Sequence, residues 1–590
     1  MKLPPTEGPV VVSILGLAWR VGNAMARRAG IRAVPPLVVG LALAAAANAV
    51  PAEGLPANPL APAALWEAWP THRVVPISAP CLRPAELAER LTALARRHPG
   101  ELDLTEVGRS VEGRPIFRLM LGHGPAKVLL WSQMHGDEPS ATPALLDLAE
   151  YLLSHRGDAA VDRLLAGLTL VMVPMLNPDG AEAYTRRNAQ AIDINRDALN
   201  LTTPEGRLLE RLRREHAPIL GFNLHDQNRR RTVGESRVLA VGAVLAVVGD
   251  AAKTVTPGRR RAMRAAVAVQ AAIAPFVPGR LARYDDDWSL RAFGDNLTAW
   301  GTPVLLIESG GVPEGASLAE LTRLNFVALG ATLDALAADD LAGFDATAYE
   351  SIPENNSDVW ADVAWRGGRI RQPASPEAYR ADLAFNVLRN DREREGCAPQ
   401  RLPRSPRSEI VELGDARVFG AAREVDATGR VIVAPFSVGA AGWKARRLLD
   451  AAGLDRLAHH GVAEVRWAVP ERKVGAALAQ VGALRGAGRP RVEVTTETAA
   501  LPPCRLRRPL GTPTGGTFGQ RIEALAKACA LPTAADENAR LAALWASRRP
   551  LLRFEGPASF LVVAAPGDDL LGGAVERVVL EGVELEGGSR

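Results

Sequence analysis

The sequence predicts an α/β fold for residues 84–338, because two kinds of pattern alternate along this stretch. Continuous apolar runs of strand length, such as 127–133 (KVLLWSQ) and 168–176 (LTLVMVPML), follow segments of helical periodicity such as 84–97 (PAELAERLTALARR). Runs of this kind are typical of strands buried on both faces, and helices between them predict a sandwich with a largely buried sheet. The other elements expected here are strands at 219–224 and 303–307 and helices at 143–153, 204–215 and 318–336.

The length and charge of the chain limit its possible functions. A chain of 590 residues is too long for one hydrophobic core, so we expect two or more domains. The formal net charge of +4 is small for this length and argues against a nucleic-acid partner. The arginine runs at 229–231 and 259–261 are predicted to be solvated loops.

The N-terminus has the pattern of an export signal. The segment that begins at Met25 (MARRAGIR) is basic, residues 37–47 are apolar, and Ala47-Asn48-Ala49 has the form of a cleavage site. We therefore expect a signal peptide at 1–49 with Met25 as the true start, and a secreted or periplasmic protein. No stable membrane span is expected after cleavage, and the alternative is a membrane anchor formed by residues 9–19 or 37–47.

The chain contains four cysteines, at positions Cys81, Cys397, Cys504 and Cys529. In an exported protein an even number of cysteines permits two disulfides, and the pairing stays open. Their spacing does not match a zinc knuckle.

Four polar residues lie at the C-terminal ends of apolar runs, namely His135, Asn177, His225 and Glu308. In open α/β sheets, ligands bind at the edge formed by the carboxyl ends of the strands. The sequence therefore predicts that separate strands bring these polar groups to one rim.

His135, Glu138 and His225 form a candidate metal site. A histidine and a carboxylate three residues apart can face one ion from a single turn, and Pro139 suits the first turn of the helix that follows. Two histidines and one glutamate are a known ligand set for catalytic zinc, with the fourth position left to water. The alternative for His225 is a hydrogen-bonded residue in a packed loop.

Glu308 directly follows the apolar residues 304–307 (VLLI). A carboxylate in this position costs desolvation energy unless it has a partner or a task. Beside a metal ion it would act as the general base for a bound water. The alternative is a structural glutamate in a salt bridge.

These motifs, taken in order, resemble the zinc carboxypeptidase family over residues 80–338. The matching segments are His135 to Glu138, Asn177-Pro178-Asp179-Gly180, Arg186-Arg187-Asn188, Asn195-Arg196-Asp197, Asn223-Leu224-His225 and Glu308. The resemblance implies a carboxypeptidase-like α/β/α sandwich with a mixed central sheet and one Zn²⁺ ion. It also implies that His135, Glu138 and His225 hold the zinc and that Glu308 is the general base and acid.

The resemblance implies substrate-binding roles for four more residues. Arg186 matches the arginine that polarises the scissile carbonyl. Asn195 and Arg196 match the pair that binds the terminal carboxylate of the peptide, for which a planar guanidinium is well suited. Tyr284 lies in the interval that holds the family's mobile tyrosine.

The chain departs from the digestive enzymes of this family around the third proposed ligand. An insertion at about 229–285 and the pair Asp226-Gln227 differ from them, so the resemblance does not imply a side-chain preference. We predict that Asp226 or Asn223 supports a zinc-binding histidine from outside the ligand set.

The C-terminal half carries a second, weaker resemblance. Residues 361–371 and 409–435 look like the small β-sandwich that flanks amidohydrolase barrels, but residues 436–439 (FSVG) lack the His-x-His of the barrel strand. We therefore expect a β-rich accessory domain that holds no metal of its own.

The predicted layout is a signal peptide at 1–49, a linker or arm at 50–80, a zinc carboxypeptidase catalytic domain at 81–340, a β-sandwich-like domain at 341–436 and a mixed α/β region of unknown role at 437–590.

Three functions fit these observations. The first is a zinc-dependent metallocarboxypeptidase that uses metal-activated water to remove C-terminal residues from peptides with a free terminal carboxylate. The second is an amidase or deacylase on the same scaffold that cleaves a non-peptide or cell-wall amide, for which Arg196 would be dispensable. The third is a carbohydrate- or peptide-binding protein with a vestigial site. The sequence leaves the preferred C-terminal residue and the oligomeric state open.

Overall fold

The structure is a computed structural model, and it describes most of the chain after residue 57. The described residues are 58–76, 81–311, 318–356, 359–373, 375–388, 407–499, 501, 504–507, 510, 516–531, 537–545, 552, 559–564, 570, 574–580 and 583–586. The predicted signal peptide at 1–49 lies outside these residues.

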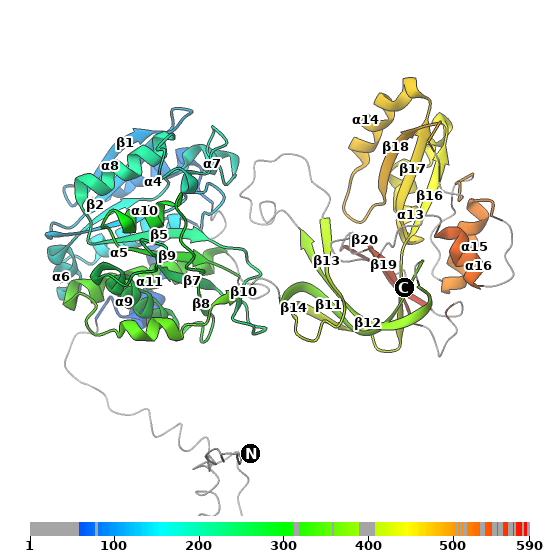
Figure 1. The fold of residues 1–590 in the computed structure, drawn as a ribbon. Helices are drawn as coiled ribbons and strands as arrows, with labels where there is room; N and C mark the ends of the chain where they lie inside the picture. The colour runs from blue at the N-terminus through cyan, green and yellow to red at the C-terminus, as the bar shows by residue number, and fades with distance from the viewer. Residues whose placement is uncertain are drawn as a thin grey trace, which may run out of the picture. The chain divides into compact units, whose positions relative to one another are not determined.

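An eight-stranded sheet forms the centre of the N-terminal part, with the strand order β1-β2-β4-β3-β5-β9-β7-β8 (Figure 1). Its strands are β1 (Leu102–Arg109), β2 (Pro115–Leu121), β3 (Ala126–Trp131), β4 (Leu168–Val173), β5 (Leu220–Asp226), β7 (Gly242–Ala246), β8 (Leu281–Arg283) and β9 (Val304–Ser309). The central strands β4, β3, β5 and β9 run parallel, whereas β1 with β2, β2 with β4 and β7 with β9 pair antiparallel. The sheet is therefore mixed, and the predicted α/β fold class is confirmed.

Helices cover both faces of this sheet. The helices on one face are α4 (Pro84–Arg97), α5 (Ala141–Ser154), α6 (Ala159–Gly167), α9 (Pro257–Ile273) and α11 (Leu318–Asp339), and those on the other are α8 (Pro204–His216) and α10 (Phe293–Ala299). Leu130 and Met172 belong to the first apolar core, while their strand neighbours Leu129 and Val171 belong to the second. Because successive side chains of a strand point to opposite faces, two covered faces require the unbroken apolar runs seen in the sequence.

Two segments have more helical structure than the sequence predicts. The expected turn at Asn177-Pro178-Asp179-Gly180 begins the short helix α7 (Pro178–Ala183), because the Asn177 side chain accepts a hydrogen bond from the Gly180 amide at 2.9 Å. The expected linker or arm contains α3 (Pro62–His72), whose Trp69 indole donates to the buried Asp147 carboxylate at 2.9 Å.

The prediction that the arginine runs are solvated loops is wrong for residues 259–261, whereas residues 229–231 lie in a loop as predicted but are only partly exposed. Residues 259–261 lie in α9, and the buried Arg259 is 3.4 Å from the Asp286 carboxylate. In the other run, Arg230 donates to Asp362 at 2.7 Å, and Arg231 is half-buried. The carboxylates of Asp286 and Asp362 neutralise Arg259 and Arg230, and no local sequence pattern shows such partners.

Helix α11 is a core element. Within the part of the chain that the structure describes, it is the one helix whose length and composition would allow a membrane crossing. It is mostly buried and packs against α3, α5 and α9. Its apolar character is therefore explained by its place in the core.

The C-terminal region contains two further sheets and is rich in β-structure, as expected. One has the order β13-β12-β11-β15-β19-β20-β21, with β14 beside β11, and the other has three parallel strands in the order β16-β17-β18. The strands are β11 (Trp360–Gln372), β12 (Ser375–Leu388), β13 (Arg407–Gly414), β14 (Gly420–Asp426), β15 (Arg430–Val433), β16 (Phe436–Ala441), β17 (Val462–Val469), β18 (Arg491–Thr496), β19 (Phe560–Ala564), β20 (Ala574–Leu580) and β21 (Val583–Glu586). The helices include α13 (Ala451–His459), α14 (Val474–Leu484), α15 (Phe518–Ala528) and α16 (Glu537–Leu544).

The larger C-terminal sheet takes strands from both sides of residue 436, where the sequence predicts a domain boundary. That boundary, the one at 340 and the likeness to the amidohydrolase β-sandwich stay predictions.

A disulfide joins Cys504 to Cys529, and Cys81 is disulfide-bonded as well.

Candidate metal centre

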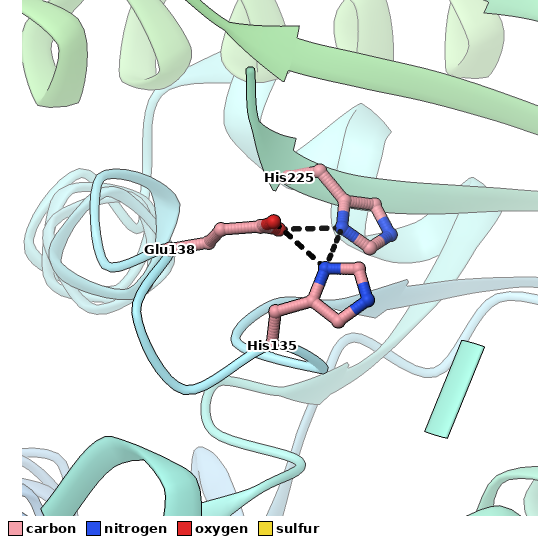
Figure 2. Close-up of side chains that lie close together, drawn as sticks. All are labelled: His135, Glu138 and His225. Carbon is pink, nitrogen blue, oxygen red and sulfur yellow. Dashed lines mark hydrogen bonds and ion pairs between the residues drawn. The ribbon is translucent and has the colours of Figure 1, made fainter. Parts of the chain in front are cut away.

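His135, Glu138 and His225 converge on one point (Figure 2). The Nδ1 atoms of the two histidines are 3.1 Å apart, and the Glu138 carboxylate oxygens lie 2.7 Å from His135 Nδ1 and 2.6 Å from His225 Nδ1. All three residues are buried. In a tetrahedral zinc site with bonds of about 2.0–2.1 Å, ligand atoms are about 3.3 Å apart. The donor set and its spacing therefore fit zinc with a small outward adjustment.

Gly136 and Gly180 let the His135–Glu138 turn approach the segment 177–180 closely. A Cβ atom on Gly136 would lie 1.9 Å from the backbone carbon of Gly180, so the two segments touch through their main chains. Asn177 adds a hydrogen bond from its side-chain amide to the Met134 carbonyl at 3.3 Å. The asparagine-containing motif after β4 thus has a structural task, because it supports the turn that carries His135.

Glu308 lies on β9 directly across from His225 on the neighbouring parallel strand β5. It is 9% exposed, and no ion pair to it is found among the residues that the structure describes. Burial raises the pKa of Glu308 well above its ordinary value, and the negative charge of Glu138 adds to this effect. The alternative of a structural, salt-bridged glutamate therefore has no support in the described part of the chain.

Asp193 is a site residue that the sequence reasoning missed. Its Oδ1 accepts a hydrogen bond from His135 Nε2 at 3.2 Å, and its Oδ2 accepts one from Arg186 Nε at 2.9 Å. A hydrogen on Nε2 directs the Nδ1 lone pair of His135 toward Glu138 and His225, as metal binding requires. The available signal was its position two residues before the motif Asn195-Arg196-Asp197.

The electrostatic field at this point favours a cation. Burial alone would lower the pKa of His135, but Glu138 and Asp193 raise it to about 9. Burial opposes ionisation of Glu138, yet the two histidines lower the pKa of its carboxyl group below the ordinary value. Burial lowers the pKa of His225 in contrast, so the negative charge that would favour a divalent ion comes from Glu138 and Asp193 beside His135.

Arg186 reaches into the centre from its edge. Its Nη1 lies 3.1 Å from His135 Nδ1 and 3.4 Å from Glu138 Oε1, while Asp193 holds its Nε. The side chain remains 43% exposed. Its guanidinium is therefore anchored at one end and accessible to a ligand at the other.

Asn195 and Arg196 lie in a short 3-10 turn (Ile194–Arg196) that packs against α10. The Asn195 side-chain oxygen accepts a hydrogen bond from the Phe293 amide at 2.9 Å. Arg196 is exposed, and its Nη1 donates to the Asn195 carbonyl at 2.7 Å. This pair is connected to the metal ligands through Asp193. The Asp193 carboxylate accepts a hydrogen bond from the Asn195 amide at 2.9 Å and another from His135.

Tyr284 directly follows β8 and is half-buried. Burial raises the pKa of its phenol, and the negative charge of Glu308 acts in the same direction. The ring is therefore within electrostatic reach of Glu308, although no hydrogen bond joins these two described side chains.

Asp226 supports the turn that carries Glu138. Its carboxylate accepts hydrogen bonds from the Ser140 hydroxyl and from the Ser140 amide, the latter at 3.2 Å. Its own amide donates to Glu138 Oε2 at 3.4 Å. The carboxylate that contacts a ligand histidine is instead Asp193, while the Asn223 side-chain oxygen is buried and has no hydrogen-bond partner in the described structure.

Comparison with known proteins gives a family for part of the chain. Residues 87–207 match the zinc carboxypeptidase family, peptidase family M14. This stretch contains His135, Glu138, Arg186 and the pair Asn195-Arg196, and it ends before His225. The resemblance predicted from the motifs is confirmed over this range.

Curated relatives match over a similar stretch. Carboxypeptidase D from Anas platyrhynchos is 33% identical over 129 residues, which are 19% of this chain and 9% of that protein. Human carboxypeptidase D is 33% identical over 132 residues, covering 20% of this chain and 10% of the relative. Carboxypeptidase E from Caenorhabditis elegans is 32% identical over 134 residues, covering 19% and 28%. The chain thus spans only a small part of the length of these relatives.

Solved structures are similar over a larger share of the chain. A metallo-carboxypeptidase from Burkholderia cenocepacia has 20% identity and a TM-score of 0.35, covering 42% of this chain and 67% of that one. A metallo-carboxypeptidase from Pseudomonas aeruginosa, in complex with (2-guanidinoethylmercapto)succinic acid, has 25% identity and a TM-score of 0.35, covering 43% and 69%.

Proposed function

We propose, from the zinc carboxypeptidase match of residues 87–207, that this chain is a zinc-dependent carboxypeptidase that removes C-terminal residues from peptides. The observation that carries the proposal is the convergence of His135, Glu138 and His225, with Glu308 on the adjacent strand. These three side chains would hold one zinc ion. When bound, zinc supplies Lewis acidity and lowers the pKa of a water molecule to about 7.

Glu308 would move the proton in this reaction. Its raised pKa lets the carboxylate take a proton from the attacking water and release it to the leaving amine. Arg186 would donate to the scissile carbonyl oxygen, since its guanidinium combines an anchored Nε with an exposed end. Arg196 and Asn195 would bind the terminal carboxylate, and Tyr284 would close on the substrate from the other side of the site.

A peptide-library digest read by mass spectrometry tests the proposal. The purified chain, loaded with zinc, is expected to release single C-terminal residues, and a chelator is expected to abolish the release until zinc is restored. Peptides with an amidated C-terminus serve as the matched control, because they lack the carboxylate. Internal cleavage, or release that resists chelation, would contradict the proposal.

The alternative is an amidase or deacylase on the same scaffold. It is distinguished by Arg196→Ala, which changes an exposed side chain that donates a hydrogen bond to the neighbouring Asn195 carbonyl. A carboxypeptidase is expected to lose peptide turnover in this variant, mainly through a higher KM. Full activity of Arg196→Ala on its best substrate would favour the alternative.

We also propose that the chain is exported. The support is the signal pattern at residues 25–49 together with the disulfide between Cys504 and Cys529, since disulfides persist in oxidising compartments. Sequencing the N-terminus of the protein recovered from the periplasm or the medium tests this, with a start near residue 50 as the expected result.

A further inference from the structure

Arg231 lies beside Tyr284 at the edge of the candidate metal centre. Its guanidinium carbon is 5.8 Å from the centre of the Tyr284 ring. The charges that act on the Tyr284 phenol are those of Glu308, Arg231, Glu138 and Arg186. Arg231 therefore places a positive charge on the side of the centre that Tyr284 occupies.

The loop that carries Arg231 is fixed against the end of β9. Gln227 donates from its amide to the Ser309 carbonyl at 2.7 Å, and the Gly311 amide donates to the Ala240 carbonyl at 2.9 Å. A Cβ atom on Gly311 would lie 2.0 Å from the Arg229 carbonyl oxygen. The glycines after Glu308 thus let the loop approach closely, and the position of Arg231 is tied to that of Glu308.

Arg231 differs from the two arginines before it. Arg229 and Arg230 lie 3.5 Å and 2.7 Å from the Asp362 carboxylate. No carboxylate lies within ion-pair distance of Arg231 in the described part of the chain, and its buried Nε has no hydrogen-bond partner there. A half-buried guanidinium without a counter-charge is costly, so we expect a ligand to supply that charge.

We propose that Arg231 binds a negatively charged side chain of the substrate, so that the enzyme prefers Asp or Glu in one of the two residues that flank the scissile bond. The inference rests on the proposed carboxypeptidase function. Arg186 is already held by Asp193, and Arg196 is assigned to the terminal carboxylate. A guanidinium suits a second carboxylate because it can bind both oxygens.

The acidic run Asp285-Asp286-Asp287 follows Tyr284. By its charge it would favour a substrate with a basic side chain, which is the opposite of the proposed preference. It is partly neutralised within the chain, because Lys253 lies 2.6 Å from Asp286 and 3.4 Å from Asp287. Arg259 adds a second cation 3.4 Å from Asp286. Among the described residues, the acidic run is therefore paired with cations, whereas Arg231 contacts the Tyr284 ring and has no carboxylate partner.

Matched peptides that carry Glu or Gln test the proposal, first as the C-terminal residue and then as the residue before it. The zinc-loaded full chain is expected to show a higher kcat/KM for Glu at one of these positions. Arg231→Gln is expected to reduce the Glu-to-Gln ratio by about 10- to 100-fold, the effect of one charge-assisted hydrogen bond. Arg231→Lys retains part of the ratio, and Arg230→Gln, the adjacent control, retains all of it.

The ratio of the two rates does not depend on how much of a variant is folded, so a poorly folding variant still gives a result. Equal rates for Glu and Gln in the natural chain, a preference for Lys over Gln, or an unchanged ratio in Arg231→Gln would overturn the inference and leave the proposed function standing. Absence of turnover on every peptide would overturn both.

Discussion

His225 and Glu308 are direct neighbours across β5 and β9, so that a proposed metal ligand and the proposed proton carrier share one register of the sheet. A shift of either strand by one residue would turn one of the two side chains to the opposite face. The pairing therefore fixes which carboxyl group can serve the site. Because backbone hydrogen bonds hold β9 in place, the Glu308 side chain can be replaced by one of the same size without moving the strand.

Glu308→Gln is expected to lower kcat/KM by about 10²–10⁴, because an amide of the same size cannot accept the proton. Zinc content, measured by elemental analysis, is expected to stay at the level of the natural chain. Ser309→Ala is the matched control on the same strand, since it removes only a hydrogen bond from Asn325 at 2.8 Å. Full peptide turnover by Glu308→Gln would remove this residue from the mechanism.

Asp193→Asn is expected to weaken zinc binding by about 10- to 100-fold, measured by competition with a chelator, because His135 loses its orienting acceptor. The nearby Asp197→Asn is the control. Asp197 accepts from the Thr202 and Thr203 amides at 2.9 Å and 2.8 Å and caps the entry to α8, so its loss affects stability and not zinc affinity. Equal zinc affinity in the two variants would show that His135 needs no such support.

Asp226→Asn and Ser140→Ala are expected to weaken zinc binding through the same contact. Asp226 holds Ser140, the residue directly before α5, and Ser140 lies two positions after Glu138. If the Asp226–Ser140 contact is the cause, the double variant should bind zinc with about the affinity of whichever single variant binds it less tightly. The coupling energy between the two substitutions is then about 0.5–3 kcal/mol. Additive losses in chelator competition would mean that the two residues act separately.

Asp147 predicts a pH dependence of stability. Burial raises its pKa to about 7 from 3.8, although hydrogen bonds from Val74 and Trp69 oppose this. The folded state then binds the proton more tightly, so this contribution to stability is full below about pH 4 and is lost as the pH rises through 7.

The free energy of unfolding should therefore fall with rising pH by up to about 4 kcal/mol more in the natural chain than in Asp147→Asn. Denaturant titrations at pH 4.5, 6 and 8 measure this difference, and other titrating groups cancel in the comparison. Parallel pH curves for the two proteins would show that Asp147 is ionised in the folded state across this range.

The strands that position the site could be predicted because they are buried on both faces. The predicted runs at 127–133, 219–224 and 303–307 correspond to β3, β5 and β9 with ends that differ by a few residues. Strands β1, β2, β7 and β8 were not predicted. Residues 242–246 (GAVLA) lie in an alanine- and valine-rich stretch, where a short apolar run fits a helix as well as a strand.

The ligand candidates could be predicted for a related reason, since each ends or follows such a strand. Asp193 and Arg231 lie in irregular segments, and their importance depends on neighbours that are distant in the chain. Asp193 contacts His135 across 58 positions, and Arg231 differs from Arg230 only because Asp362 reaches one and not the other. Residue type and spacing do not contain this information.

Helix α3 has a practical consequence for any shortened version of this protein. Trp66 stacks on Phe276 at 4.1 Å between ring centres, and the Arg323 guanidinium lies 3.7 Å from the Trp66 ring. A fragment that starts at residue 81, as the motif boundaries suggest, would lack α3 and expose the apolar residues that pack against it, which favours self-association. Expression work on the N-terminal half should therefore keep residues 58–76, because aggregates of a shorter fragment are easily mistaken for an inactive protein.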